Sequence, residues 1–217
     1  MKTKFLFPAL LLSVLCLPGC DWHRIRGNGK ITTEQRPVTD FTRVEAGGFY
    51  ELEWHPGPPS FSLTTDENLL SHIRTRMEGD RLKIDMEDGP MAPTDGIKVV
   101  ITSASLVGAE LSGAVEFNAT QLSTPKFVLE TSGAAKISLT GKVNRLLASL
   151  TGASKLEADG LPAEDVELSV TGAGKANIVA SNSLRAAITG AGKVTYGGNP
   201  KTVEKKITGA GKIEPRD

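Results

Sequence analysis

The phrase Ser/Thr-Gly-Ala-x-Lys recurs through the second half of this chain and constrains its fold more than any other feature. It occupies residues 132–136, 151–155, 171–175, 189–193 and 208–212, and residues 112–116 hold a weaker copy that ends in Glu116. Successive glycines of the phrase are 20, 19, 20, 18 and 19 residues apart. A repeat of that length is typical of a solenoid, in which each unit stacks on the next.

Apolar residues recur at fixed offsets from each of these glycines. They stand six, four and two residues before it and four and six residues after it in nearly every copy, the exceptions being Thr131, Lys205 and Pro215. A spacing of two puts the members of such a set on one face of a strand, so two half-buried strands flank each glycine. Glycine permits the sharp corner between them. Because Lys205 and Pro215 belong to the last copy, we expect the final rung to act as a cap against further strand pairing.

A third, looser segment completes each repeat, and it carries Leu122, Val143, Leu161 and Val179 beside several turn-forming residues. A circuit of about 19 residues at ~3.3 Å each is roughly 60 Å long, which suits rungs about 4.8 Å apart. The signatures of leucine-rich repeats and of calcium-binding β-rolls are absent. We therefore predict an all-β fold, a single-stranded parallel β-helix (solenoid) with three sides and rungs of about 19 residues.

The first 19 residues have the composition of a secretory signal peptide. Lys2 and Lys4 precede an apolar run, residues 5–17, that is too short to span a bilayer stably. The following Leu17-Pro18-Gly19-Cys20 resembles a bacterial lipobox, which implies cleavage before Cys20 and lipidation of its thiol. The alternative is ordinary cleavage near Gly19 that leaves a free thiol. We expect residues 1–19 to be removed and residues 20–39 to form a lipidated cysteine and a tether.

A lipidated Cys20 implies a place in the bacterial cell envelope, because two or more acyl chains anchor a protein stably at a membrane. Asp21 follows the cysteine directly. In enterobacterial sorting an aspartate at that position resembles a signal for retention at the inner membrane, whereas other bacteria read the position differently. The choice between inner and outer membrane therefore stays open.

The charge balance and the cysteine count exclude several classes of function. The chain has 25 basic and 25 acidic residues, and loss of Lys2 and Lys4 leaves a net charge of −2. With aromatic residues at 5%, we expect neither attraction to nucleic acid nor a stacking platform for bases. Cys16 and Cys20 are the two cysteines, so the processed domain would have no disulfide and no thiol catalyst. We expect no cofactor.

Residues 40–106 are rich in strands but lack the repeat. Candidate strands cover residues 41–44, 49–54, 61–64, 81–86 and 97–101. Residues 57–59 and 78–80 look like hairpin turns, and residues 66–73 hold a helical turn. We thus divide one domain, residues 40–213, into irregular rungs over 40–106 and regular rungs over 107–213, with a tail at 214–217.

The order of these segments, joined to the repeated Thr-Gly-Ala-Gly-Lys, resembles the bacterial GIN-domain family of auto-transporter adhesin heads. Four stretches outside the repeat carry the resemblance: residues 41–49, 66–70, 80–84 and 97–102. The resemblance covers roughly residues 40–213. It implies a right-handed β-helix, a location in the cell envelope and a role in adhesion, but it assigns no binding residue.

The lysines that end the phrase form the sharpest candidate site. Stacked rungs would set them in one row at intervals of about 4.8 Å, and the row comprises Lys136, Lys155, Lys175, Lys193 and Lys212. Such a row could bind an anionic glycan or another envelope polymer. The alternative is a set of solvated corners that discourage aggregation. Glu116 and Glu157 would partly neutralise the row.

Other reactive side chains lack the partners that chemistry needs. The hydroxyls that precede each glycine, Ser112, Ser132, Thr151, Thr171, Thr189 and Thr208, have no histidine nearby in the repeat, so we expect them to bond from rung to rung. The three histidines, His23, His55 and His72, lack the spacing of metal ligands. Among the acidic residues of the repeat, Glu164, Asp165 and Glu167 come closest to a cluster.

We expect a non-enzymatic, lipid-anchored envelope protein whose β-helix presents a surface for adhesion or scaffolding. Two alternatives stay open. A polysaccharide-active β-helix enzyme would need clustered carboxyl groups. An envelope stress or signalling module would need a protein partner. The sequence does not indicate an oligomeric state.

Overall fold

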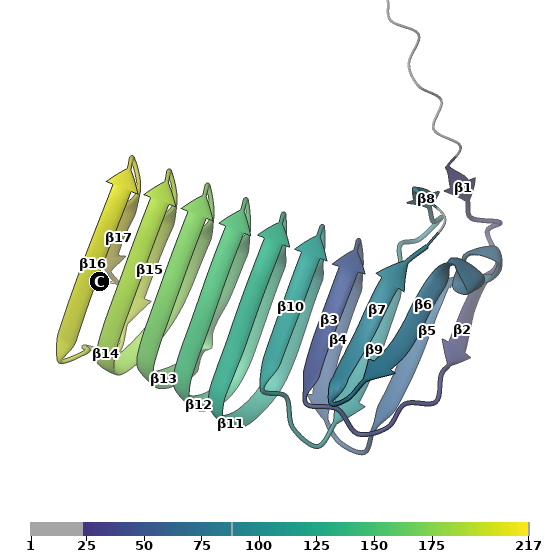
Figure 1. The fold of residues 1–217 in the computed structure, drawn as a ribbon, viewed down its shortest axis with the longest axis horizontal. Coiled ribbons are helices and arrows are strands. Elements are labelled where there is room, and N and C mark those ends of the chain that lie inside the picture. The colour runs from purple at the N-terminus through teal and green to yellow at the C-terminus, as the bar shows by residue number, and fades with distance from the viewer. Residues whose placement is uncertain (1–23, 88, 217) are drawn as a thin grey trace, which may run out of the picture.

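The computed structural model describes residues 24–87 and 89–216, and most of these residues lie in strands stacked side by side along one axis (Figure 1). The regular rungs are formed by β10 (Gly108–Gly113), β11 (Glu116–Gly133), β12 (Lys136–Gly152), β13 (Lys155–Gly172) and β14 (Lys175–Gly190). The next rung is formed by β15 (Lys193–Gly197) and β16 (Thr202–Gly209), and β17 (Lys212–Pro215) begins one more rung. Each pairs in parallel with its counterpart in the preceding rung. The predicted all-β parallel solenoid is confirmed.

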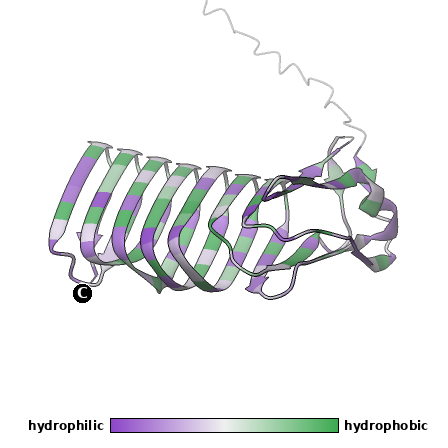
Figure 2. Cartoon of the chain, turned by 60° about the horizontal axis from the view of Figure 1, so that its bottom comes forward, coloured by the Kyte–Doolittle hydropathy of each residue, from purple (hydrophilic) through white to green (hydrophobic). Residues whose placement is uncertain are grey.

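The predicted apolar columns form the core of the coil. Phe117, Ile137, Leu156, Ala176 and Val194 pair in register from rung to rung, and all five are buried. Hydropathy accordingly alternates along the strands in Figure 2. The columns are less buried at both ends of the repeat. Val107, at the N-terminal end, is half-buried, and the side chains of β16, at the C-terminal end, are exposed.

The glycines of the phrase stack directly on one another at a corner of the coil. Their φ angles lie between 91° and 119°, a region that other residues rarely adopt. A Cβ at any of them would lie 2.3 to 2.6 Å from the carbonyl oxygen of the glycine in the preceding rung. Both the turn and the close approach of two backbones therefore require glycine at this column.

The variable residue x of the phrase points inward, which the sequence patterns did not predict. Val115, Ala135 and Ser154 are buried at this position, and glycine replaces them from residue 174 onward. A Cβ on Gly174 would meet Val170 Cγ1 at 2.9 Å, so neighbouring side chains already fill the corner. Thr131, a buried polar exception in the core columns, donates a hydrogen bond to Ser154 Oγ at 3.1 Å.

The third segment of each repeat closes the coil less regularly. Leu122, Val143 and Leu161 are buried as predicted, but in the next rung Ala180 faces the core and Val179 is only half-buried. The rung-to-rung register shifts within or beside this segment in each regular pair. Differences in repeat length are absorbed there, where loops tolerate them.

Residues 43–103 extend the coil toward the N-terminus instead of forming a separate cap. Strands β3 (Arg43–Gly48) and β4 (Glu51–Pro56) pair in parallel with β10 and β11, and Gly48 stacks on Gly113 at the corner. Strands β7 (Arg81–Met86) and β9 (Lys98–Ser103) add a further layer. The coil therefore begins before the regular repeat.

Antiparallel strands cover the N-terminal end of the coil. Strand β6 (Ile73–Glu78) forms a hairpin with β7, which confirms the predicted turn at 78–80. Strand β5 (Ser60–Asp66) pairs with β9 instead of β4, so the predicted hairpin at 57–59 is wrong: both strands flank β9. The short 3-10 helix η1 (Glu67–His72) confirms the expected helical turn.

The described part of the expected tether, residues 24–39, is folded onto the domain. Strand β1 (Ile25–Arg26) pairs with β8 (Met91–Ala92), and β2 (Ile31–Gln35) pairs with β5. The buried Asp66 carboxylate holds the loop between β1 and β2, because it accepts hydrogen bonds from Gly29 N at 2.7 Å and from Thr94 N at 2.8 Å. The prediction of a tether over 20–39 is therefore wrong for these residues.

The expected tail at 214–217 is also shorter than predicted. Strand β17 continues to Pro215 because it pairs with β15, with Thr195 opposite Glu214. Lys205 lies across the end of the coil, where its ammonium donates to Ile213 O at 3.1 Å and sits 4.9 Å from the centre of the Tyr196 ring. These contacts cover part of the coil end, as the expected cap requires, but no described strand pairs with the other side of β16.

Candidate functional site

The five lysines of the phrase lie in one row along the side of the coil. Each follows the corner by three residues, and direct register joins Lys136 to Lys155, Lys155 to Lys175, Lys175 to Lys193 and Lys193 to Lys212. All five are exposed. The glycine corner sets this phase, because its stacked backbones repeat the same turn in every rung.

Three glutamates lie against this lysine row. Glu116 bonds Lys136 at 2.6 Å, and Glu157 bonds Lys155 at 2.6 Å. Glu214 pairs with Lys193 at 2.7 Å and also with Lys212. The ion pairs of Glu116 and Glu157 confirm the partial neutralisation of the row that was expected from the sequence. The role of Glu214 was missed because that residue was assigned to the tail.

Hydrogen bonds lower the pKa of two of these carboxylates, Glu157 and Glu214. The ammonium groups of Lys193 and then Lys212 lower the pKa of Glu214 to about 2. Lys155 and then Asn177 lower the pKa of Glu157, and Asn177 donates to it across one rung at 2.7 Å. At neutral pH the row thus has five positive and three negative charges, a local excess of two cations.

Lys175 stands in the middle of the row with no ion pair to any residue in 24–87 or 89–216. Its register neighbours on both sides are Lys155 and Lys193, about 4.8 Å away at the backbone. Among the described residues, Lys175 is therefore the lysine of the row whose charge no carboxylate offsets.

The hydroxyl column beside the corner is in register but does not form the expected ladder. Ser132, Thr151, Thr171 and Thr189 pair directly from rung to rung and are exposed. Within the described chain no hydrogen bond joins one of these hydroxyls to the next. Equivalent hydroxyls on neighbouring rungs repeat at about the rung spacing of 4.8 Å, which exceeds hydrogen-bond distance.

The remaining candidate groups do not converge. His55 Nδ1 lies 2.9 Å from Thr120 Oγ1, His72 belongs to η1 on the N-terminal cover, and His23 lies outside the described residues. In residues 24–87 and 89–216 no group of three or more histidine, cysteine or acidic side chains is placed to hold a metal ion. Cys20 and the expected signal peptide also lie outside the described residues, and no helix among those described is long and apolar enough to cross a membrane.

One member of the acidic cluster of the repeat, Asp165, is held by local hydrogen bonds. Asp165 accepts from Asn182 Nδ2 at 2.9 Å and from Ser183 Oγ, and these contacts, with Ser183 first, lower its pKa. Every described carboxyl group with a resolved pKa shift has its pKa lowered. A general acid for glycoside cleavage needs the opposite, a raised pKa.

The hollows on the surface are shallow. One of about 420 Å³ lies over the outer face of the sheet, where Val128, Leu147, Ser149, Ser169 and Ala187 form part of its lining. No aromatic side chain lines it. It therefore lacks the ring on which a sugar stacks.

Proteins of known structure share the fold over most of this chain. A putative adhesin from Bacteroides fragilis is 20% identical with a TM-score of 0.73, and the match covers 88% of this chain and 100% of that one. A putative lipid binding protein from Parabacteroides distasonis is 22% identical with a TM-score of 0.60, covering 89% of this chain and 100% of its own. A putative adhesin from Parabacteroides merdae is 21% identical with a TM-score of 0.55, covering 89% and 99% respectively.

No protein with a curated description matches the chain. The family model described as "Putative auto-transporter adhesin, head GIN domain" matches residues 40–200, most of the chain, and the protein therefore belongs to that family.

Proposed function

We propose that this protein is a non-enzymatic, lipid-anchored component of the bacterial cell envelope, and that it uses the side of its coil for adhesion. Membership of an adhesin-head family and the similar folds named as adhesins support the role. The lipobox-like residues before Cys20 support the anchor. The lowered pKa values of the carboxyl groups favour this role over a polysaccharide-cleaving enzyme.

The lysine row carries the more specific proposal, that the ligand is an anionic glycan or another anionic envelope polymer. One exposed lysine contributes little to binding, because water and salt screen it. Five lysines at a constant rung spacing can contact several charges of one polymer that lies along the coil axis, and these contacts add as avidity. Lys175, which has no ion pair among the described residues, provides the centre of the site.

A binding assay with a matched control tests this proposal. Dextran sulfate and polyphosphate serve as probes against residues 21–217, which contain every described residue. One variant changes Lys175→Gln and Lys193→Gln. The control changes Lys126→Gln and Lys142→Gln, which removes the same charge from exposed lysines of other segments. We expect salt-sensitive binding that the row variant loses and the control keeps.

Equal losses in the two variants would mean that overall charge, and not the row, attracts the polymer. Absence of binding by the parent would assign the lysines to solvated corners. Either result would leave a scaffold or a protein-partner role as the better explanation.

The anchor has its own test in the full chain. Expression in a bacterium with labelled palmitate should label the parent, and Cys20→Ala should remove the label. Cys16→Ala is the matched control, because Cys16 lies in the segment expected to be removed. Label that survives Cys20→Ala would contradict the lipobox interpretation.

A further inference from the structure

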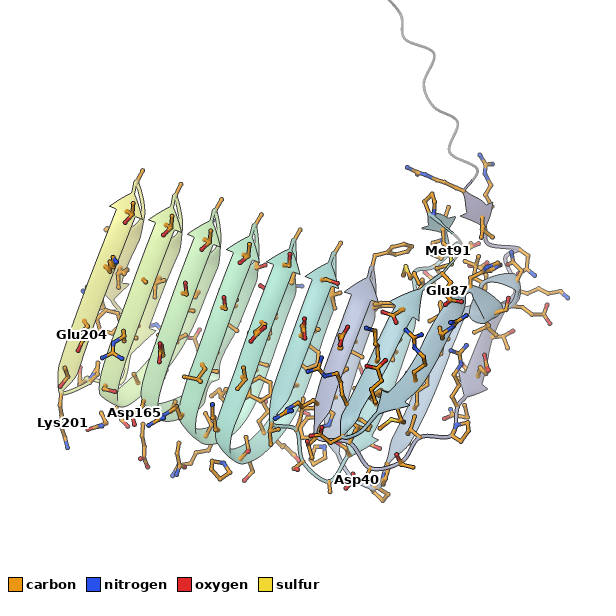
Figure 3. All side chains as sticks on the ribbon, in the orientation of Figure 1. Asp40, Glu87, Met91, Asp165, Lys201 and Glu204 are labelled. Atoms are coloured by element: carbon orange, nitrogen blue, oxygen red, sulfur yellow. The ribbon has the colours of Figure 1, made fainter. Side chains whose placement is uncertain are left out.

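The C-terminal end of the coil exposes a complete strand edge. Strand β16 pairs with β14 on one side, and no described strand pairs with its other side. All eight of its residues are exposed, with Val203 at 37% and Ile207 at 44%. The one other exposed large hydrophobic residue of the described chain is Ile31, at the opposite end of the coil. Glu204 and Lys201 mark this end in Figure 3.

The backbone groups at this edge can be assigned from the regular rungs. Residues with outward side chains donate their backbone N–H to a carbonyl of the preceding rung. Val128 N, for example, donates to Val107 O at 2.9 Å. In a parallel ladder alternate residues bond to alternate neighbours, so residues with inward side chains direct their N–H and C=O to the following rung. In β16 those residues are Val203, Lys205 and Ile207, and among residues 24–87 and 89–216 no strand follows β16 on that side.

Strand β17 differs from β16 at the same edge. In β17 the residues whose backbone groups point away from the preceding rung are Ile213 and Pro215. Proline has no N–H to donate, so it blocks pairing at an edge. The free edge at the C-terminal end of the coil is therefore open along β16 and partly closed along β17.

The sequence of β16 is nearly palindromic about Lys205. It reads Thr202-Val203-Glu204-Lys205-Lys206-Ile207-Thr208. In an antiparallel pair centred on Lys205, Val203 lies opposite Ile207 of a second copy and Glu204 lies opposite Lys206. Residues directly opposite one another share a face, so the apolar pairs cover the open end of the core and the charged pairs face the solvent.

We propose that two copies of this protein associate end to end through antiparallel pairing of β16 about a two-fold axis at Lys205. The unpaired N–H and C=O groups of three residues in each strand would then bond across the interface. The exposed Val203 and Ile207 side chains would lose contact with water, which drives the association. The same patch meets itself, as a closed two-fold interface requires.

Lys205 limits the strength of this association. The two Lys205 side chains would face each other, and like charges that lie opposite one another in a sheet are destabilising. Each ammonium is drawn back toward its own coil by Ile213 O and the Tyr196 ring. The dimer is thus weak and concentration-dependent, and salt strengthens it.

The geometry gives this dimer a use that rests on the proposed function. Strands β1 and β16 lie at opposite ends of the coil in Figure 1. The two-fold axis therefore puts the two N-terminal ends at the far ends of a doubled coil. With each copy anchored near its N-terminus, two surfaces that display this protein would be joined through identical contacts.

Sedimentation of residues 21–217 over a wide concentration range, at low and high salt, tests the association without any polymer or membrane. We expect a dimer whose dissociation constant rises at least about tenfold in Ile207→Lys, because a buried aliphatic side chain is worth roughly 1.5 kcal/mol or more. Lys205→Met should tighten the dimer on the order of fivefold by removing the facing charges. The control Ile31→Lys changes an equally exposed residue, at 45%, and should have no effect.

Thermal unfolding checks that each variant is folded. A parent chain that stays monomeric at every concentration overturns the proposal, even if Lys205→Met dimerises, because Lys205 would then act as a block. Loss of the dimer in Ile31→Lys would also overturn it by moving the interface to the other end. Because the assay contains no anionic polymer, neither result bears on the binding role of the lysine row.

Discussion

Gly172→Ala tests whether the stacked corner glycines hold the coil together. Gly172 has φ of +109°, and a Cβ there would lie 2.6 Å from Gly152 O in the preceding rung. The obstacle is backbone that already belongs to a stacked corner, so no side chain can rotate away. The substitution must therefore change either the turn or the distance between two rungs.

The cost follows from three contributions. A non-glycine residue forced into a sparsely populated region costs about 1–3 kcal/mol, and overpacking costs about 1–3 kcal/mol. The lower entropy of an unfolded chain with alanine offsets about 0.4–1 kcal/mol. The free energy of unfolding should thus fall by about 1–5.5 kcal/mol, with a centre near 3 kcal/mol. For a chain of this size, the central value lowers the midpoint of thermal unfolding by roughly 6–12 °C.

Circular dichroism on residues 21–217 measures this midpoint. Gly197→Ala is the matched control, because Gly197 lacks a positive φ and its Cβ would meet nothing closer than Val179 Cγ2 at 3.9 Å. The control midpoint should stay within about 3 °C of the parent, since surface substitutions without strain change stability little. A Gly172→Ala protein as stable as the control would refute the argument that close backbone contact requires glycine at the corner.

Three further predictions follow from individual contacts. Leu168→Asp puts a charge into a core column where Leu168 is 1% exposed, so the domain should fail to unfold cooperatively in a thermal scan, whereas the exposed Lys175→Ala should match the parent. Glu214→Gln frees two lysines of the row and should tighten dextran sulfate binding at neutral pH, and unchanged or weaker binding would count against the row. Asp66→Asn should lower stability at neutral pH, because hydrogen bonds from Thr94 lower the pKa of Asp66 and stabilise its ionised form. A carboxyl group whose pKa is lowered in the folded state stabilises the fold at pH values above its unfolded-state pKa, about 3.9. In urea titrations, the difference in unfolding free energy between parent and variant should therefore shrink as the pH falls below that value. A difference that stays constant with pH would contradict the assignment.

The row of lysines could be predicted because it depends on two regularities of the sequence. Alternation with a spacing of two determines which side chains face out, and the repeat of the glycines determines which residues stack. Lys155 and Lys175 are thus neighbours in space for the same reason that Gly152 and Gly172 are. No long-range information beyond the period was needed.

The partners of the row were only partly predictable. Glu157 and Glu214 both stand five residues after a corner glycine, so the same offset could have placed Glu214 beside Lys193 and Lys212. Its position beyond the last lysine made it look like a tail. The hydroxyl ladder failed for a different reason, because register alone does not bring short outward side chains within hydrogen-bond distance.

Outside the repeat, only tertiary contacts decided the structure. The prediction of a tether was wrong because Asp66 binds Gly29 and β5 pairs with β2. No local sequence pattern indicates either contact. The hairpin at 57–59 was wrong because β9, more than 30 residues later in the chain, separates the two strands.

The sequence by itself determined the parallel coil, its buried columns, its glycine corner and the phase of the lysines, since a periodic chain repeats each local preference at every rung. The tertiary structure alone decided how the coil closes at its N-terminal end, which carboxylates neutralise the row and which edge of β16 stays open. These features join residues that share no period, so their pairing depends on the packing of the whole chain and not on any local preference.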